Sequence, residues 1–202
     1  MLSTSTPLPL PLTKEPTYYY SNLDKVEDAD GVWDIDERLP EVRKYADLRP
    51  DDRVIDIGCA EGLITMDIAE RVKHVRGVEL RRKRVEAARL IAAERGLQNV
   101  GFEVGSVTEM DLPPLSYDVV LFLGVFQHLP RKHKWASLEK VMYAAKRSVV
   151  FRTPIFNERS PYRIVKLTKL CRALDFSLTI YPRKEERGGS LMLMNRMDLD
   201  LG

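Results

Sequence analysis

The stretch that decides the fold runs from Val54 to Leu63 and reads Val-Ile-Asp-Ile-Gly-Cys-Ala-Glu-Gly-Leu. Its β-branched residues are typical of a buried strand, which we expect over residues 53–57, ended by the glycine that follows. Apolar residues then recur at helical spacing as far as Val72. The stretch therefore predicts a buried strand, a tight glycine turn and a helix over residues 63–72.

The same alternation of strand and helix continues along the chain. Helices are expected from about residue 36 to 48, over 81–95 with Gly96 as its stop, from Pro130 onward, and over 162–174. Further strands are expected over residues 74–80, 100–104, 117–123 and 148–152. Strands joined by helices predict a parallel sheet with helices on both faces.

The chain closes with two strands of a different kind. Residues 176–181 and 191–197 are joined by a short glycine-containing loop instead of a helix, which predicts an antiparallel hairpin at one sheet edge. The expected fold class is thus α/β: a doubly wound, mostly parallel seven-stranded sheet, with a C-terminal antiparallel hairpin strand.

Length and composition suit one domain. The chain has 202 residues, of which 44% are hydrophobic and 31% charged, as in an ordinary globular protein. Prolines alternate with leucines between Thr6 and Leu12, and this density favours an extended tail. We expect residues 1–35 to form that tail and residues 36–202 the domain.

Composition also argues against several classes of protein. Cys59 and Cys171 lie far apart without metal-ligand spacing, so we expect no metal site, no disulfide framework and a reducing, cytoplasmic location. No apolar run approaches the roughly 20 residues that span a bilayer, and the first residues lack the basic and apolar regions of a secretory signal, so we expect neither a membrane span nor a cleaved signal. The net charge of +2 does not by itself indicate nucleic acid.

The residues of the glycine turn indicate which class of ligand it binds. Ala60 and Leu63 stand where the dinucleotide pattern G-x-G-x-x-G wants glycine, which disfavours an NAD-type dehydrogenase. Asp56, Gly58 and Gly62 instead resemble motif I of the class I S-adenosylmethionine-dependent methyltransferases. The resemblance implies that Asp56 lies near the amino-acid end of the cofactor. It also implies that the loop, with Cys59 and Ala60, wraps the methionine part. The alternative is an ordinary strand-to-helix turn with a capping aspartate.

A second acid supports a nucleoside ligand. Glu79 ends the predicted second strand about twenty residues after Gly58, where a carboxylate accepts hydrogen bonds from both ribose hydroxyls. Leu80 follows it and is expected to contact the cofactor too. The alternative is an acid that only stabilises the start of the next helix.

Two later segments also resemble this family. Ser106 and Val107 follow the third strand and are similar to the segment that flanks the adenine, although many members have an acid at the position of Ser106. The segment from Gly124 through Val125 to Pro130 resembles the motif IV region of members that act on small molecules.

The resemblance implies methyl transfer, and three regions are candidates to assist it. His128 could act as a base, or only pack and cap the next helix. Tyr19, Tyr20 and Trp33 belong either to a lid over the substrate or to a strap covering the sheet edge. Arg152, just past the predicted fifth strand, could bind an anionic small substrate.

The absence of two known motifs disfavours some classes of methyl acceptor. No Asp/Asn-Pro-Pro-Tyr/Phe motif and no Pro-Cys nucleophile are present, which disfavours methylation of base amino groups and of cytosine C5. Basic clusters at residues 81–84 and 131–134 are either solvated faces or nucleic-acid contacts. We predict methyl transfer from S-adenosylmethionine to oxygen or nitrogen of a small molecule. An RNA (tRNA-like) methyltransferase and a non-catalytic Rossmann-like cofactor-binding module are the alternatives.

Overall fold

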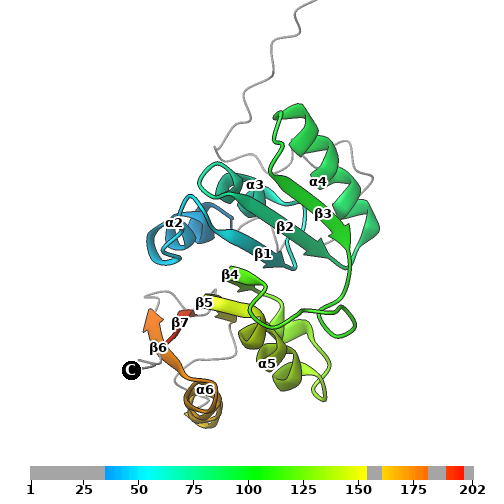
Figure 1. The fold of residues 1–202 in the computed structure, drawn as a ribbon. Coiled ribbons are helices and arrows are strands. Elements are labelled where there is room, and N and C mark those ends of the chain that lie inside the picture. The colour runs from blue at the N-terminus through cyan, green and yellow to red at the C-terminus, as the bar shows by residue number, and fades with distance from the viewer. Residues whose placement is uncertain (1–34, 154–160, 182–189, 198–202) are drawn as a thin grey trace, which may run out of the picture.

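The computed structural model describes residues 35–153, 161–181 and 190–197, and these form one seven-stranded sheet in the order β3-β2-β1-β4-β5-β7-β6 (Figure 1). The strands are β1 (Arg53–Ile57), β2 (His74–Glu79), β3 (Val100–Val104), β4 (Tyr117–Leu123), β5 (Ala145–Thr153), β6 (Phe176–Tyr181) and β7 (Ser190–Arg196). Strands β1 to β5 pair in parallel, while β7 is antiparallel to both of its neighbours. The predicted fold class and the C-terminal hairpin are confirmed.

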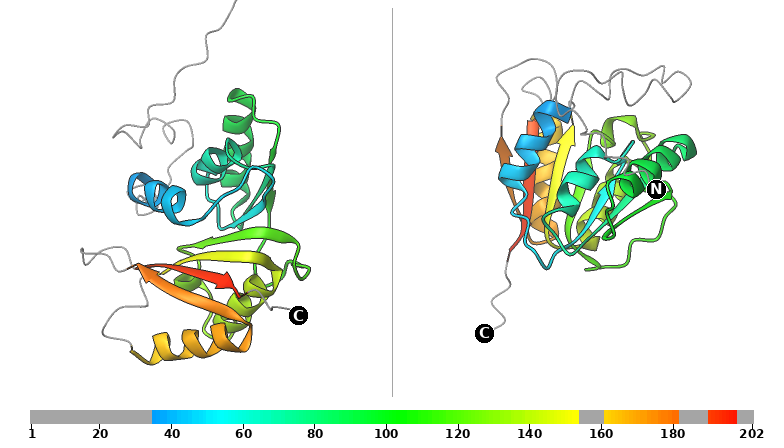
Figure 2. Two further views of the ribbon diagram at one scale, coloured as in Figure 1. Left: turned by 60° about the vertical axis from the view of Figure 1, so that its left-hand side comes forward. Right: turned by 90° about the horizontal axis from the view of Figure 1, so that it is seen from above.

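Helices cover both faces of this sheet (Figure 2). They are α2 (Ile35–Tyr45), α3 (Leu63–Ala69), α4 (Arg82–Glu94), the 3₁₀ turn η2 (Phe126–His128), α5 (Lys134–Ala144) and α6 (Pro161–Ala173). Helices α2, α3 and α4 lie on one face, and α5 and α6 lie on the other.

The central strand β4 shows why the sheet is buried on both sides. Val119 and Leu121 pack into the apolar cluster that includes residues of α2 and α3. Val120 and Phe122 point the other way, into the cluster formed with α5 and α6. Because both faces are covered, this strand is apolar throughout instead of alternating.

The structure corrects four element boundaries. Helices α2 and α3 end at Tyr45 and Ala69, each three residues before the predicted end. Helix α5 begins at Lys134 and not at Pro130, because the Pro130 carbonyl accepts the N–H groups of His133 and Lys134 in a turn that precedes the helix. Strand β5 begins at Ala145, three residues before the predicted start. The register between β4 and β5 shifts there, and two charged residues in succession, Lys146 and Arg147, hid the strand pattern.

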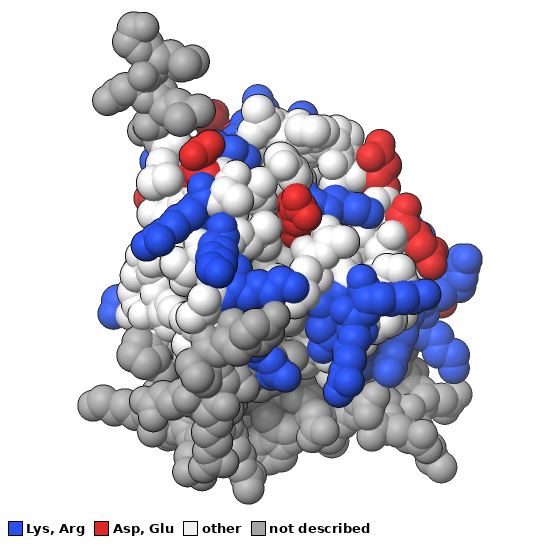
Figure 3. All heavy atoms as spheres, turned by 90° about the horizontal axis from the view of Figure 1, so that it is seen from below, with Lys and Arg blue, Asp and Glu red and all other residues white. Residues whose placement is uncertain are grey.

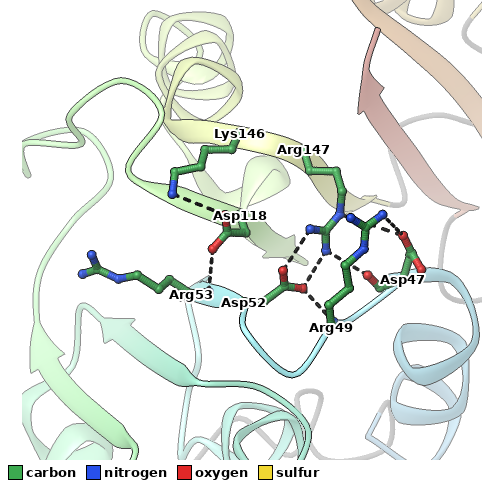
Figure 4. A network of polar contacts seen from close by, with 7 residues as sticks. All are labelled: Asp47, Arg49, Asp52, Arg53, Asp118, Lys146 and Arg147. Atoms are coloured by element: carbon green, nitrogen blue, oxygen red, sulfur yellow. Dashed lines mark hydrogen bonds and ion pairs between the residues drawn. The ribbon is translucent and has the colours of Figure 1, made fainter. Parts of the chain in front are cut away.

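Those charged residues belong to a polar network that ties the α2–β1 connection to β4 and β5 (Figure 4). The Arg147 guanidinium donates to both carboxylate oxygens of Asp52, at 2.9 and 2.6 Å, and to the Asp47 carbonyl oxygen at 2.9 Å. The bond to Asp52 raises the pKa of Arg147. Nearby, Asp118 accepts the Arg53 N–H at 2.7 Å and pairs with Lys146 at 3.3 Å. Four segments are thereby joined at the amino ends of the central strands.

Replacing Arg147 by methionine is expected to lower the free energy of unfolding by about 2–4 kcal/mol, since the Asp52 side chain is 4% exposed and would lose its cationic partner. Urea unfolding measures the change. Arg49→Met is the matched control, because the Arg49–Asp47 pair is exposed and worth less than about 1 kcal/mol. Equal losses in the two variants would contradict the importance of the buried pair.

Candidate functional site

The predicted cofactor residues meet where the strand order reverses. From β1 the chain continues to β2 and β3 on one side of the sheet, while β4 and β5 lie on the other side. Ligands of open α/β sheets bind at the carboxyl ends of strands at such a switch point. The loops after β1 and β4 touch there: a Cβ on Gly58 would lie 2.2 Å from Cγ2 of Val125.

The loop after β1 is fixed against the end of β2. The N–H groups of Gly58 and Cys59 both donate to the Val78 carbonyl oxygen, at 2.7 and 3.1 Å. Gly58 and Gly62 have φ of 79° and 77°, and Ala60 has φ of 51°, so three residues of this loop adopt the left-handed region that disfavours a side chain. The left-handed conformation of Ala60 was not predicted from the sequence, because alanine does not favour it.

Glu79 is the best-oriented acid of the site. Its side chain is 8% exposed; Oε2 accepts the Ala60 N–H at 3.2 Å and Oε1 accepts the Arg81 N–H at 2.9 Å. Arg81 is the residue that caps α4, so the acid does stabilise the start of that helix. Among the described residues, each carboxylate oxygen accepts one hydrogen bond, which leaves one of its two lone pairs for a ligand hydroxyl.

Two other motif I residues turn inward. The Asp56 carboxylate accepts the Thr65 hydroxyl at 2.7 Å and is almost fully buried, so it connects β1 to α3. The Cys59 thiol packs toward β2, where a Cβ on Gly77 would lie 2.9 Å from Sγ. Burial raises the pKa of this thiol, and the charges of Asp56 and Glu79 raise it further. The thiol therefore remains protonated within the core.

The ends of β2 and β3 form one side of the site. Leu80 is 68% exposed immediately after Glu79, an unusual position for a large apolar side chain. The Gly105 N–H donates to the Glu79 carbonyl oxygen at 3.0 Å, which brings the segment containing Ser106 and Val107 alongside. The Ser106 hydroxyl bonds to that of Thr108 at 2.8 Å, and Val107 is buried.

The loop after β4 forms the other side. Gly124 has φ of 71° and donates its N–H to the Arg152 carbonyl oxygen at 2.9 Å. His128 ends η2 with an exposed side chain, its Nε2 3.4 Å from the Gln127 amide nitrogen. Arg152 was predicted just past the fifth strand but lies within β5, because that strand continues to Thr153, and its side chain is 1% exposed.

Sequence reasoning missed three residues that shape the loop. Thr65 binds Asp56, Phe102 lies beneath Gly62, and Arg84 forms an ion pair with Glu61 at 3.2 Å. A hydroxyl three residues after Gly62 was a weak local signal, whereas the other two contacts join segments distant in sequence. The predicted substrate residues Tyr19, Tyr20 and Trp33 lie outside the described residues.

This strand order, with a glycine turn at the switch point and an acid at the end of β2, defines a Rossmann-like methyltransferase fold. The family described as a methyltransferase domain matches residues 48–173, and the chain belongs to that family.

Individual relatives differ in what their names say they methylate. The ubiquinone biosynthesis O-methyltransferase of Idiomarina loihiensis is 36% identical over 93 residues, which are 46% of this chain and 38% of the relative. The 23S rRNA (uracil(1939)-C(5))-methyltransferase RlmD of Klebsiella pneumoniae is 40% identical over 83 residues, 41% of this chain and 19% of the relative. The chain thus spans about two fifths or less of these curated relatives.

A solved structure shows the same fold over most of the chain. Magnesium protoporphyrin IX methyltransferase from Synechocystis PCC 6803, with bound S-adenosylmethionine, superposes with a TM-score of 0.66 at 19% identity. The match covers 90% of this chain and 89% of that one.

Gly62→Ala tests the turn. The new Cβ would lie 2.4 Å from the Phe102 ring, so we expect a loss of about 2–4 kcal/mol in the free energy of unfolding. Gly96→Ala is the matched control, because Gly96 also has positive φ (67°) but no atom within 4 Å of its would-be Cβ. Its free energy of unfolding should fall by only about 1 kcal/mol, which is the cost of a side chain in the left-handed conformation. Equal losses in urea unfolding would mean that the Phe102 contact is unimportant.

Proposed function

We propose that this protein is a methyltransferase that uses S-adenosylmethionine and transfers its methyl group to an oxygen or nitrogen atom. The observation that carries the proposal is the Glu79 carboxylate. Two backbone N–H groups orient it at the switch point, and each of its oxygens retains a lone pair. Family membership supports the same conclusion.

The residues of the site fit the parts of this cofactor. Glu79 would accept hydrogen bonds from the two ribose hydroxyls, and the exposed Leu80 offers an apolar surface for the adenine. The Ser106–Val107 segment would border the adenine edge. The Gly58–Gly62 loop and the Gly124–Val125 turn, which touch each other, would hold the amino-acid part.

The bound cofactor supplies an electrophilic methyl group on a sulfonium, so the protein needs mainly to align an acceptor and exclude water. His128 is the proposed proton acceptor for the attacking oxygen or nitrogen, because its exposed imidazole stands beyond the end of β4. The competing role for His128 is structural, since its backbone N–H closes η2 onto the Val125 carbonyl oxygen.

A small molecule is the first candidate acceptor. The motif IV region and the ubiquinone-pathway relative support it. RNA is the second candidate, favoured by the basic side chains of α5 and α6 and by the ribosomal RNA relative. Tyr19, Tyr20, Trp33 and Arg152 remain proposed substrate contacts, with residues 1–35 as a lid.

The setting of the enzyme is also a proposal. Cys59 and Cys171 are buried free thiols, which supports a reducing, cytoplasmic location. Among the described helices, none has the length and apolarity to cross a membrane.

Glu79→Gln tests the cofactor assignment. Loss of the charged acceptor should weaken S-adenosylhomocysteine binding about 10–100-fold in calorimetry, because a hydrogen bond to a charged group contributes about 1.5–3 kcal/mol. Glu103→Gln is the control, an acid on the neighbouring strand β3 that pairs with Arg76, and it should bind normally. Binding of NAD in place of S-adenosylhomocysteine by the unaltered protein would overturn the proposal.

His128→Ala tests the proton acceptor. If His128 is the base, transfer of tritiated methyl from S-adenosylmethionine to metabolite or RNA fractions should fall about 10²–10⁴-fold, while S-adenosylhomocysteine still binds. His133→Ala, which caps α5 nearby, is the control and should keep full transfer. Normal transfer by the His128 variant would assign it the structural role, and cofactor binding without any transfer by the unaltered protein would indicate a binding module.

A further inference from the structure

Positive charge is concentrated in one part of the chain. Residues 131–173 contain twelve Lys and Arg residues against two acidic ones, although the whole chain carries a net charge of only +2. Figure 3 looks onto the side of α5 and α6 and shows Lys and Arg side chains gathered in a band across it. Such segregation of charge is typical of proteins that bind nucleic acids or membranes.

The band joins the two helices. The Lys166 ammonium of α6 lies 4.5 Å from the centroid of the Trp135 ring of α5. The pKa of Lys134 is lowered by burial and by the positive charges of Arg163 and Arg131. Cations from both helices therefore lie together. We call the following six residues the α5–α6 basic surface: Arg131, Lys132, Lys134, Arg163, Lys166 and Lys169.

This surface borders the site. The Lys134 ammonium donates to the Gln127 carbonyl oxygen at 2.8 Å and lies 5.6 Å from the Phe126 ring centroid, so it touches the η2 turn that carries His128. A ligand lying on the surface would pass the loop after β4, where the acceptor is proposed to enter.

Three cations of this surface have no acidic partner among the described residues. Within the described parts of the chain, no carboxylate forms an ion pair with Arg131, Lys134 or Lys166, whereas Arg84 at the start of α4 pairs with Glu61. Neither α5 nor α6 has an acid in its first turn, where the helix dipole favours one. An arrangement that costs stability in this way is suited to receive negative charge from a ligand.

The extent of the surface favours a polyanion over a small anion. Lys169 lies six residues beyond Arg163, about 9 Å along α6, and Arg131 adds a position in the turn that precedes α5. A single phosphate or carboxylate cannot reach all of these cations. A membrane surface is disfavoured, because Leu167 and Cys171 on the apolar face of α6 are buried against the sheet, and the large apolar side chain that α6 exposes among its described residues is the single Val165.

We propose that the α5–α6 basic surface binds the phosphates of single-stranded RNA and delivers one of its nucleotides to the site. Single-stranded regions suit this role because their bases can be turned out of the strand to reach an active site. The delivery step rests on the proposed function, and it selects RNA, the second candidate acceptor named there, over a small molecule. RNA binding itself can be measured without cofactor.

The test is fluorescence anisotropy of a labelled 20-nucleotide single-stranded RNA across a series of KCl concentrations. The full-length protein should bind with an affinity that falls as salt rises. The triple variant Arg131→Gln, Lys132→Gln, Lys169→Gln changes exposed side chains only. Its slope of log affinity against log salt should shrink by about 2, since each phosphate contact on a single strand contributes about 0.7. At 0.1 M KCl the affinity should fall at least about tenfold.

The matched control removes three exposed positive charges at the amino ends of β1 and β2: Arg53→Gln, Arg71→Gln, Lys73→Gln. It should bind RNA as the unaltered protein does. The proposal is overturned if the unaltered protein does not bind RNA, or if the control variant loses as much RNA affinity as the first triple variant. It is also overturned if the first triple variant still binds RNA but no longer binds phosphatidylserine vesicles. Equal affinity for single-stranded DNA of the same sequence would overturn the assignment to RNA.

Calorimetry with S-adenosylhomocysteine separates this inference from the proposed function. The first triple variant should bind it normally, which shows that the fold and the cofactor site are intact. RNA binding by a protein that does not bind S-adenosylhomocysteine would overturn the methyltransferase proposal and leave the surface assignment standing. Binding of S-adenosylhomocysteine without binding of RNA would overturn the surface assignment and leave the methyltransferase proposal standing.

Discussion

The two hydrogen bonds that the Val78 carbonyl oxygen accepts from Gly58 and Cys59 hold the site together. They bend the chain sharply at the end of β1 and press the loop onto β2, which requires the left-handed conformation at Gly58. The same bend brings Gly58 against Val125 and the Ala60 N–H against Glu79. The segments that follow β1, β2 and β4 thus depend on one turn. A side chain at Gly58 would disturb the geometry of that turn.

The sequence predicted the strands well because their apolar patterns are local. Four strands, β1, β3, β4 and β6, have the predicted ends. The start of β5 was missed because Lys146 and Arg147 form ion pairs with Asp118 and Asp52, which lie far away in sequence. Charged residues that bond across the fold look, in sequence, like an exposed loop.

The sequence predicted which segments form the site, but not the directions in which their side chains point. The glycine turn and Glu79 could be found because both have a fixed spacing within one βαβ unit. Spacing does not report where a side chain points, so the inward directions of Asp56 and Cys59 became evident only with Thr65 and Gly77 in place. The uneven distribution of cations, by contrast, is visible in the sequence, but their assembly on one surface depends on α5 and α6 lying on the same face of the sheet.

The junction between α5 and β5 has a mechanical consequence. The helix ends at Ala144 and the strand begins at Ala145, so no loop separates them. The side chains on either side, Met142 and Val149, are fully buried in the same core cluster, which prevents the helix from shifting along the sheet. The start of α5 and the end of β4 therefore stay at a constant separation. For any long substrate held at the start of α5, this separation would act as a ruler that selects which unit along the substrate reaches the site.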